Sequence, residues 1–224
     1  MEKAVNNIFR FERKIVVNSH QYRDLILLFK AQGFNELYSE RNICNIYLDD
    51  LQHHSYFDNI DGNNKRLKHR IRWYGDLFGK IKQITLEQKI KFGTVGKKVN
   101  FKIEKEFEFK SNINYLDLTN FVRDLIISLK DKVFVSLLYP TSINTYTRSY
   151  YSDYSNKFRI TIDKNIKYYS LQNKIKLQKS DERIIVEIKY ENENEFFTSE
   201  LLNSLNFRLA KNSKYVNGIE ALKY

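Results

Sequence analysis

The stretch KRLKHRIRWYGDLFGKIKQITLEQKIK, residues 65–91, decides the fold of this chain. In its first run, Lys68, Arg70 and Arg72 alternate with apolar or aromatic side chains, as in a strand with one buried face. After a turn over residues 75–79, a second run over residues 84–91 shows the same alternation. The two runs therefore predict a β-hairpin with one apolar face and one densely cationic face.

The cationic face of this hairpin needs a counter-charge. Like charges that stand directly opposite each other on neighbouring strands repel and destabilise a sheet. The arrangement is tolerable if an anion lies against the basic side chains. We therefore expect the rest of the chain to close this face around a polyanion.

The composition fits a folded protein with an anionic partner. The chain has 224 residues, of which 42% are hydrophobic, and it carries 38 Lys and Arg against 27 Asp and Glu, a net charge of +11. With one Pro and seven Gly, it has little material for linkers, and we expect a single domain over residues 1–224. The charge favours nucleic acid, nucleotide, polyphosphate or an acidic lipid surface, and does not choose among them.

Cysteine, histidine and membrane signals are weak. A single cysteine, Cys44, excludes an internal disulfide and a thiolate zinc site. The four histidines show no metal-like spacing. The first residues lack the apolar core of a signal peptide, and no stretch reaches the length of a membrane span. The expected location is therefore cytoplasmic, or the cytosolic face of a membrane through a partner.

Charged alternation recurs along the chain and predicts the class of fold. The expected strands cover residues 8–17, 42–49, 97–109, 133–139, 145–153, 158–163 and 183–190, besides the hairpin. The expected helices begin after Ser19 and cover residues 115–130 and 193–205. This is an α+β pattern with a mostly antiparallel sheet. Strands with charge on one face bury it usefully by curling into a barrel whose outer apolar face is covered by helices.

The charged positions suit phosphate chemistry. Arginine grips phosphate oxygens with two hydrogen bonds, and lysine supplies a point charge. A few carboxylates among them can hold a divalent cation that bridges phosphates. Any one such strand has a simpler explanation as a solvated sheet face, but the repetition over many strands favours an enclosed polyanion site.

The ordered motifs resemble a known family. They are Glu12-x-Lys14, Tyr47-x-Asp49, Arg70-x-Arg72, Glu87-x-Lys89, Tyr146-x-Arg148, Arg159-x-Thr161-x-Asp163, Glu187-x-Lys189 and Ser213-Lys214-Tyr215. Over residues 8–219 this series resembles the VTC-type polyphosphate polymerase domain of the triphosphate tunnel metalloenzyme (CYTH-like) superfamily. The resemblance implies an eight-stranded antiparallel β tunnel barrel with helices packed outside and a triphosphate-binding interior.

The resemblance also implies roles for individual residues. The catalytic residues would be Arg70, Arg72, Arg148, Arg159 and Lys189. The substrate-binding residues would be Lys14, Lys89, Lys91, Lys214 and Tyr146, with help from Lys98. The metal-binding carboxylate for Mn²⁺ or Mg²⁺ would be Glu187, and the secondary candidates, for metal or for orienting basic groups, are Glu12, Glu87 and Asp163.

The implied activity is a phosphotransferase reaction. The γ-phosphate of ATP would pass to a growing polyphosphate chain, and pyrophosphate or triphosphate would fit the same tunnel. Hydrolytic members of the superfamily open with Glu-x-Glu-x-Lys, whereas this chain has Arg10-Phe11-Glu12-Arg13-Lys14, which favours the polymerase. A separate membrane protein that carries the product across a membrane is a further expectation.

Other functions stay open at this point. One is a hydrolase that acts on inorganic triphosphate or polyphosphate in the same tunnel. Another is a non-catalytic module that binds polyphosphate or RNA. Nucleic acid is the less favoured ligand, because the inward positions are mainly charged, whereas readers of single strands display aromatic side chains. An adenylyl cyclase on the same scaffold is formally possible.

Overall fold

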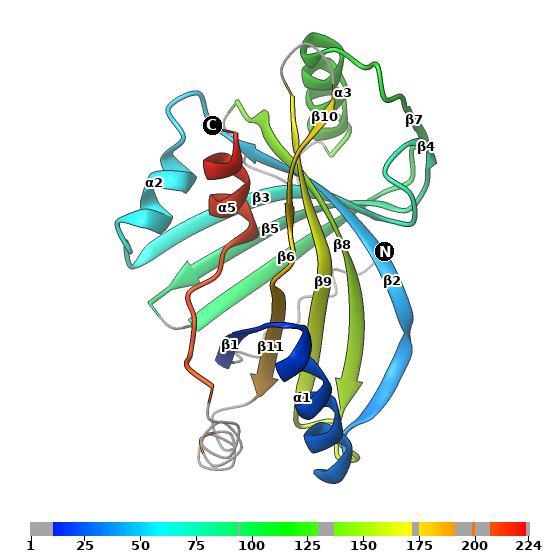
Figure 1. Ribbon diagram of the computed structural model, residues 1–224. Helices are drawn as coiled ribbons and strands as arrows, with labels where there is room; N and C mark the ends of the chain where they lie inside the picture. Colours follow the sequence, from blue (N-terminus) through cyan, green and yellow to red (C-terminus); the bar gives the residue numbers. More distant parts are fainter. Residues whose placement is uncertain are drawn as a thin grey trace.

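The computed structural model describes residues 11–93, 95–129, 137–171, 175–190, 199 and 207–222. The strands are β1 (Phe11–Val17), β2 (Asn35–Asp49), β3 (Lys65–Tyr74), β4 (Gly79–Ile81), β5 (Ile84–Phe92), β6 (Val95–Ile103), β7 (Phe107–Phe109), β8 (Tyr139–Ser152), β9 (Arg159–Ser170), β10 (Lys176–Asp181) and β11 (Ile184–Tyr190). The helices are α1 (Ser19–Ala31), α2 (His54–Ile60), α3 (Tyr115–Ser128) and α5 (Lys214–Ala221). Figure 1 shows their arrangement.

The main sheet is antiparallel and strongly curled. Its strands follow the order β1-β11-β9-β8-β2-β3-β5-β6, and β10 pairs with β9 beside this path. Within the described residues no ladder joins the two edge strands, β1 and β6. The side chains nevertheless cross the gap, because Lys89 Nζ of β5 lies 3.0 Å from Glu12 Oε2 of β1. The predicted antiparallel sheet with its charged face inside is confirmed, but among the described residues the backbone does not close it into a barrel, and the charged space that it curls around is called the tunnel below.

The predicted hairpin is confirmed, with one addition. β3 pairs with β5, and Arg70 stands opposite Glu87 while Lys68 stands opposite Lys89. The connection between them is more than a turn, because it contains β4, which pairs with β7 in a small second sheet. The strand predicted over residues 97–109 is accordingly split into β6 and β7. The split follows from the register. β5 begins at Ile84, which pairs with Ile103, so residues after Ile103 have no partner on β5 and β6 ends there.

The outer face of the sheet is apolar and covered by two helices, as predicted. Under α3, the buried cluster includes Trp73, Leu86 and Leu125. Under α1, it includes Phe29 and Ile162. In Figure 1, α1 and α3 lie at opposite ends of the sheet. Each large apolar side chain that is fully buried in this way stabilises the fold by about 2 kcal/mol.

The last helix lies on the other side of the sheet. An ideal Cβ on Gly218 of α5 would lie 3.0 Å from the Oγ atom of Ser142, whose neighbour in the ladder is the inward-facing Tyr47. Tyr215 stacks on Tyr47, with ring centroids 5.2 Å apart, and donates a hydrogen bond to buried Asp49. Thus α5, drawn in red beside α2 in Figure 1, packs against the inner face. The helix was not expected from the sequence.

A bulge in β9 prepares the surface on which α5 packs. Thr147 of β8 pairs with Lys164, but Thr145 pairs with Lys167, so β9 contains one extra residue between these pairs. Asn165, within the bulge, has a positive φ of 53°, a left-handed conformation that asparagine tolerates better than most residues. Because of this shift, the inward-facing positions of β9 change from odd-numbered residues such as Asp163 to even-numbered ones, the buried Ile166 and Tyr168.

Some expected segments lie outside the described residues. They are residues 8–10 of the first strand, most of the strand predicted at 133–139, and most of the helix predicted at 193–205. Among the described residues, no helix combines the length and the apolar character that a bilayer span requires.

We predict that Gly218→Ala weakens the packing of α5, because the added Cβ would come within 3.0 Å of Ser142 Oγ and 3.4 Å of the Tyr168 ring. The expected loss in the free energy of unfolding is about 1–3 kcal/mol, measured by urea denaturation. Gly96→Ala is the matched control, since its Cβ would meet only an ordinary contact at 3.5 Å. Equal stabilities for the two variants would contradict this account of the packing.

Candidate functional site

The inner face of the curled sheet gathers charged side chains from strands far apart in the sequence. The register of neighbouring strands places them on one face, and their contacts run across the tunnel. The carboxylates among them are Glu12, Glu87, Asp163 and Glu187. The basic side chains that lie with them are Lys14, Lys68, Arg70, Arg72, Lys89, Lys98, Arg148, Lys189 and Lys214.

Glu87 is the centre of the first cluster. Its Oε2 atom accepts a hydrogen bond from Arg70 Nε at 2.6 Å. Its Oε1 atom lies 3.2 Å from Arg72 Nη1 and 2.5 Å from Lys98 Nζ. Burial alone would raise the pKa of this carboxyl, but Arg70, Arg72 and Lys98 hold it well below its usual range. The carboxylate therefore stays ionised and fixes the direction of both arginines.

Arg72 is buried, and all three nitrogens of its guanidinium group donate hydrogen bonds within the protein, which differs from the direct catalytic role expected from the sequence. Its side chain is only 6% exposed. Besides Glu87, it donates to Asn45 Oδ1 at 2.9 Å and to the hydroxyl of Tyr146 at 2.8 Å. With its donor groups bonded within the protein, Arg72 acts on a ligand mainly through its charge and through the neighbours it positions. Asn45, which the sequence analysis missed, belongs to this network.

Asp163 is the centre of the second cluster. Arg148 donates two hydrogen bonds to its carboxylate, at 2.5 and 2.7 Å, and Lys214 of α5 donates a third. Tyr146 lies between these groups, with its ring centroid 5.2 Å from the Arg148 guanidinium and 4.6 Å from Lys214 Nζ. Burial alone would raise the pKa of the Tyr146 phenol, but Arg148 and Arg72 lower it. Tyr146 thus joins the two clusters.

Glu12 and Glu187 form the third cluster, at the β1–β11 pair. Lys14 Nζ lies 2.8 Å from Glu12 and 3.4 Å from Glu187, while Lys189 Nζ lies 2.6 Å from Glu187. Burial and the charge of Glu187 tend to raise the pKa of Glu12, but Lys14 and Lys89 outweigh them and lower it to about 2. Lys14 therefore holds two ionised carboxylates close to each other.

This pair is the part of the tunnel that best fits a divalent cation. Mg²⁺ and Mn²⁺ in phosphate sites are held by one or two carboxylates, with phosphate oxygens and water completing the shell. Among the described residues, no group of three or more His, Cys, Asp or Glu could hold a metal ion. Glu12 and Glu187 together offer the two-carboxylate arrangement. Glu87 and Asp163 are each bound by several cations, and the geometry favours their second expected role, the orientation of basic groups.

Two expected site residues lie toward the margins. Lys91 shares the inner face of β5 with Lys89 and stands opposite Gly96. Burial and the charge of Arg66 lower its pKa. Arg159 pairs with Lys189 at the start of β9 and is exposed to solvent. The structure places both beside the tunnel rather than within the three clusters.

Lys68 is an inward-facing cation that the predicted site omitted. It is partly buried, and its Nζ atom lies 2.9 Å from Ser213 Oγ at the N-cap of α5. The sequence did contain a signal, because Lys68 occupies the same face as Arg70 and Arg72. The other cations of the clusters pair with carboxylates, several of them on other strands, whereas Lys68 contacts a serine hydroxyl. The sequence alone could not reveal this difference, because it does not show which strands meet.

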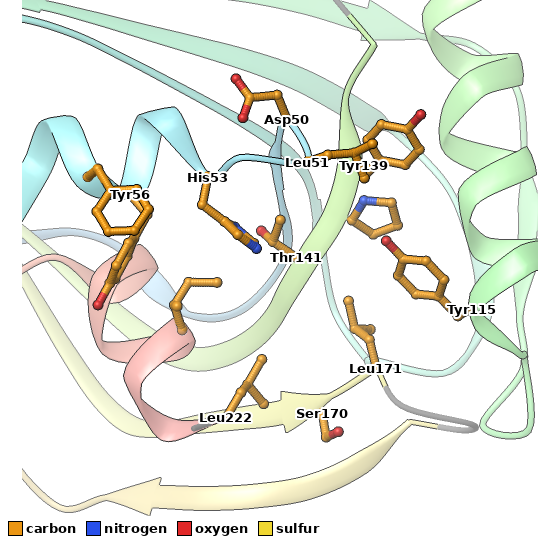
Figure 2. A pocket seen from close by; sticks show the side chains of 13 residues that line it. Asp50, Leu51, His53, Tyr56, Tyr115, Tyr139, Thr141, Ser170, Leu171 and Leu222 are labelled. Carbon is orange, nitrogen blue, oxygen red and sulfur yellow. The ribbon is translucent and has the colours of Figure 1, made fainter. Parts of the chain in front are cut away.

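A separate cavity of about 820 Å³ lies beside α5 (Figure 2). Its lining is largely aromatic and aliphatic, with Tyr56, Tyr115, Tyr139 and Leu171 among the residues that face it. None of the described residues that line it is a lysine or arginine, so this lining lacks the charge that a polyanion requires. The tunnel is therefore the candidate site for phosphate.

The comparisons with known proteins agree with this geometry. The profile of the VTC domain family matches residues 9–223. A predicted adenylate cyclase from Bacillus halodurans has a similar structure, with a TM-score of 0.55 and 14% identity over 94% of this chain and 96% of that one. A predicted adenylate cyclase from Vibrio parahaemolyticus is also similar, with a TM-score of 0.53 and 11% identity over 97% of this chain and 99% of that one. A search of curated protein sequences finds no significant match.

The curled antiparallel sheet, with its charged face inward, has the CYTH-like tunnel fold that these two structures share. The chain belongs to the VTC domain family. Family and fold support a function connected with triphosphate or polyphosphate.

The carboxylate clusters predict a loss of stability in acid. The pKa of Glu12 falls from 4.5 to about 2 on folding, so its ion pairs stabilise the fold above pH 4.5 and this contribution disappears as the pH falls toward 2. We expect Glu12→Gln to lower the free energy of unfolding by about 2 kcal/mol at neutral pH and to reduce its dependence on pH in this window. Urea denaturation at several pH values measures both effects.

Glu106→Gln is the control, since Glu106 forms an exposed pair with Lys82 that contributes little. If the free energy of unfolding of Glu12→Gln depended on pH as it does in the wild type, the ion pairs of Glu12 would not be the source of this acid sensitivity.

Proposed function

We propose that this protein is an ATP-dependent polyphosphate polymerase. The terminal oxygen of a polyphosphate chain, positioned in the tunnel, attacks the γ-phosphorus of ATP, and ADP leaves. One phosphoanhydride bond forms as another breaks, so the reaction needs no oxidant or further reactant. The observation that carries this proposal is the convergence of the three ion-pair clusters on one enclosed face, in a chain of the VTC domain family.

Charge supports a phosphate chain as the occupant of the tunnel. The inward basic residues clearly outnumber Glu12, Glu87, Asp163 and Glu187, and a buried excess of cations is costly unless anions compensate it. Arg70 and Arg148 are held in fixed directions by Glu87 and Asp163. Preorganised cations of this kind stabilise the charge that develops on a transferring phosphoryl group.

The distribution of histidine supports transfer without a general base. His69 points to the outer face and contacts Gln88, and burial lowers its pKa to about 4. His20 lies in α1, while His53 and His54 lie at the start of α2, so none of the four stands among the tunnel clusters. A phosphate nucleophile is already anionic at neutral pH and needs no base, whereas water does.

The carboxylates support transfer over hydrolysis in a second way. Each of the four inward carboxylates contacts at least one lysine or arginine, which leaves it a weak acceptor for a proton from water. A bound Mg²⁺ or Mn²⁺ on Glu187 and Glu12 would neutralise charge on the phosphate oxygens. Arg70, Arg148, Lys14 and Lys189 then position the phosphates of both substrates.

The direct test is incubation with ATP and Mn²⁺, followed by a gel stained for polyphosphate and an assay for orthophosphate. We predict a long polymer and little orthophosphate. Arg70→Ala should reduce polymer formation at least about 100-fold. It should remain folded, because Glu87 keeps Arg72 and Lys98 as partners. Orthophosphate without polymer would instead identify a hydrolase, and wild-type rates in the variant would refute the role of Arg70.

Arg148 needs a matched design. Its removal alone leaves the buried Asp163 with only Lys214, so a loss of activity could reflect misfolding. The double variant Arg148→Met with Asp163→Asn removes charge in pairs and is the better probe of the same role.

The metal assignment makes a separate prediction. Glu187→Gln should lower activity at limiting Mn²⁺ about tenfold or more and raise the Mn²⁺ concentration needed for half-maximal rate. Glu87→Gln should reduce the rate without changing that concentration, because Glu87 orients arginines. Titration of activity with Mn²⁺ after treatment with EDTA measures both. The same Mn²⁺ requirement in wild type and Glu187→Gln would rule out this residue as a ligand.

A further inference from the structure

Three lysines stand in a row on the inner face. Lys68 of β3 is the direct partner of Lys89 of β5, and Lys89 is the direct partner of Lys98 of β6. Lys89 is compensated by Glu12, and Lys98 is compensated by Glu87. Lys68 takes part in none of the ion pairs found among the described residues, and its partner is the neutral hydroxyl of Ser213.

The charged groups that act most strongly on Lys68 are cations. Lys89 acts from β5, Lys14 from β1, and Arg66 and Arg70 from the same strand, β3. Burial, followed by repulsion from Lys89 and Lys14, lowers the pKa of Lys68 to about 6. Glu12, the carboxylate that compensates Lys89, is also bound to Lys14. When no anion is bound, burial and these neighbouring cations therefore favour the uncharged amine near neutral pH.

We propose that Lys68 is a phosphate-binding residue that takes up a proton when a polyphosphate chain enters the tunnel. The neutral amine accepts one proton from the solvent. The resulting ammonium breaks its hydrogen bond with Ser213 Oγ and donates a hydrogen bond to a phosphate oxygen instead. The proton returns to the solvent when the chain leaves. This inference rests on one part of the proposed function, the binding of a linear polyphosphate in the tunnel, and does not require phosphate transfer.

The consequence is a defined pH dependence of binding. An anion beside Lys68 raises the pKa of the bound state, so binding of phosphate is coupled to uptake of a proton wherever the free side chain is neutral. Affinity should therefore fall as the pH rises above about 6, the pKa of the free side chain. An arginine at this position stays charged throughout and needs no proton.

Calorimetry with sodium tripolyphosphate, without ATP or metal, tests the inference. Binding is measured at pH ~8 in HEPES and in Tris, whose ionisation enthalpies differ, so that the number of protons exchanged is obtained. We expect the wild type to take up close to one proton more than Lys68→Arg. Tripolyphosphate can itself exchange protons, and the comparison between variants cancels this contribution. Lys97→Arg is the control, because Lys97 is exposed and pairs with Ile90 on the outer register.

A second variant measures the contribution to affinity. Lys68→Met should weaken tripolyphosphate binding about 10- to 100-fold at pH ~7 and distinctly less at pH ~9, where the uptake of a proton by the wild-type amine costs more free energy. Equal proton uptake by wild type and Lys68→Arg, or unchanged affinity in Lys68→Met, would overturn the inference and leave the proposed function standing. Failure of the wild type to bind tripolyphosphate at all would overturn both.

Discussion

The structure depends on the compensation of many cations within one enclosed space. Each of the four cluster carboxylates is shared by at least two basic side chains, as Glu87 is by Arg70, Arg72 and Lys98. Removing one partner of such a buried cluster costs several kcal/mol, whereas an intact cluster contributes far less net stability. The clusters are therefore better understood as supports that hold cations at fixed positions than as a source of stability.

This arrangement also determines what a ligand must supply. A phosphate chain brings oxygen atoms that can accept from arginines already pointed in fixed directions, so little side-chain entropy is lost on binding. A metal ion, in contrast, has to share Glu12 and Glu187 with Lys14. Metal and phosphate therefore suit the tunnel together, because the negative phosphate relieves the repulsion between the ion and the lysines.

The amino-acid sequence predicts the two faces of the sheet better than the contacts within it. Alternation over residues 68–74 and 84–91 is strong because one face is apolar, and it yields the hairpin and its inward side. Which carboxylate meets which cation depends on the register between strands more than a hundred residues apart, as for Glu12 and Glu187. The sequence holds little trace of this. The eight-residue α5 escaped prediction because its position depends on tertiary contacts of Tyr215 and Gly218 with the inner face.

The extra residue in β9 divides one strand into two chemically different halves. Before the bulge, Thr161 and Asp163 face the tunnel, and after it the same face presents Ile166 and Tyr168. Continued alternation would instead have turned Lys167 inward. The bulge therefore determines where the polar part of this wall ends and where the apolar part, against which α5 packs, begins.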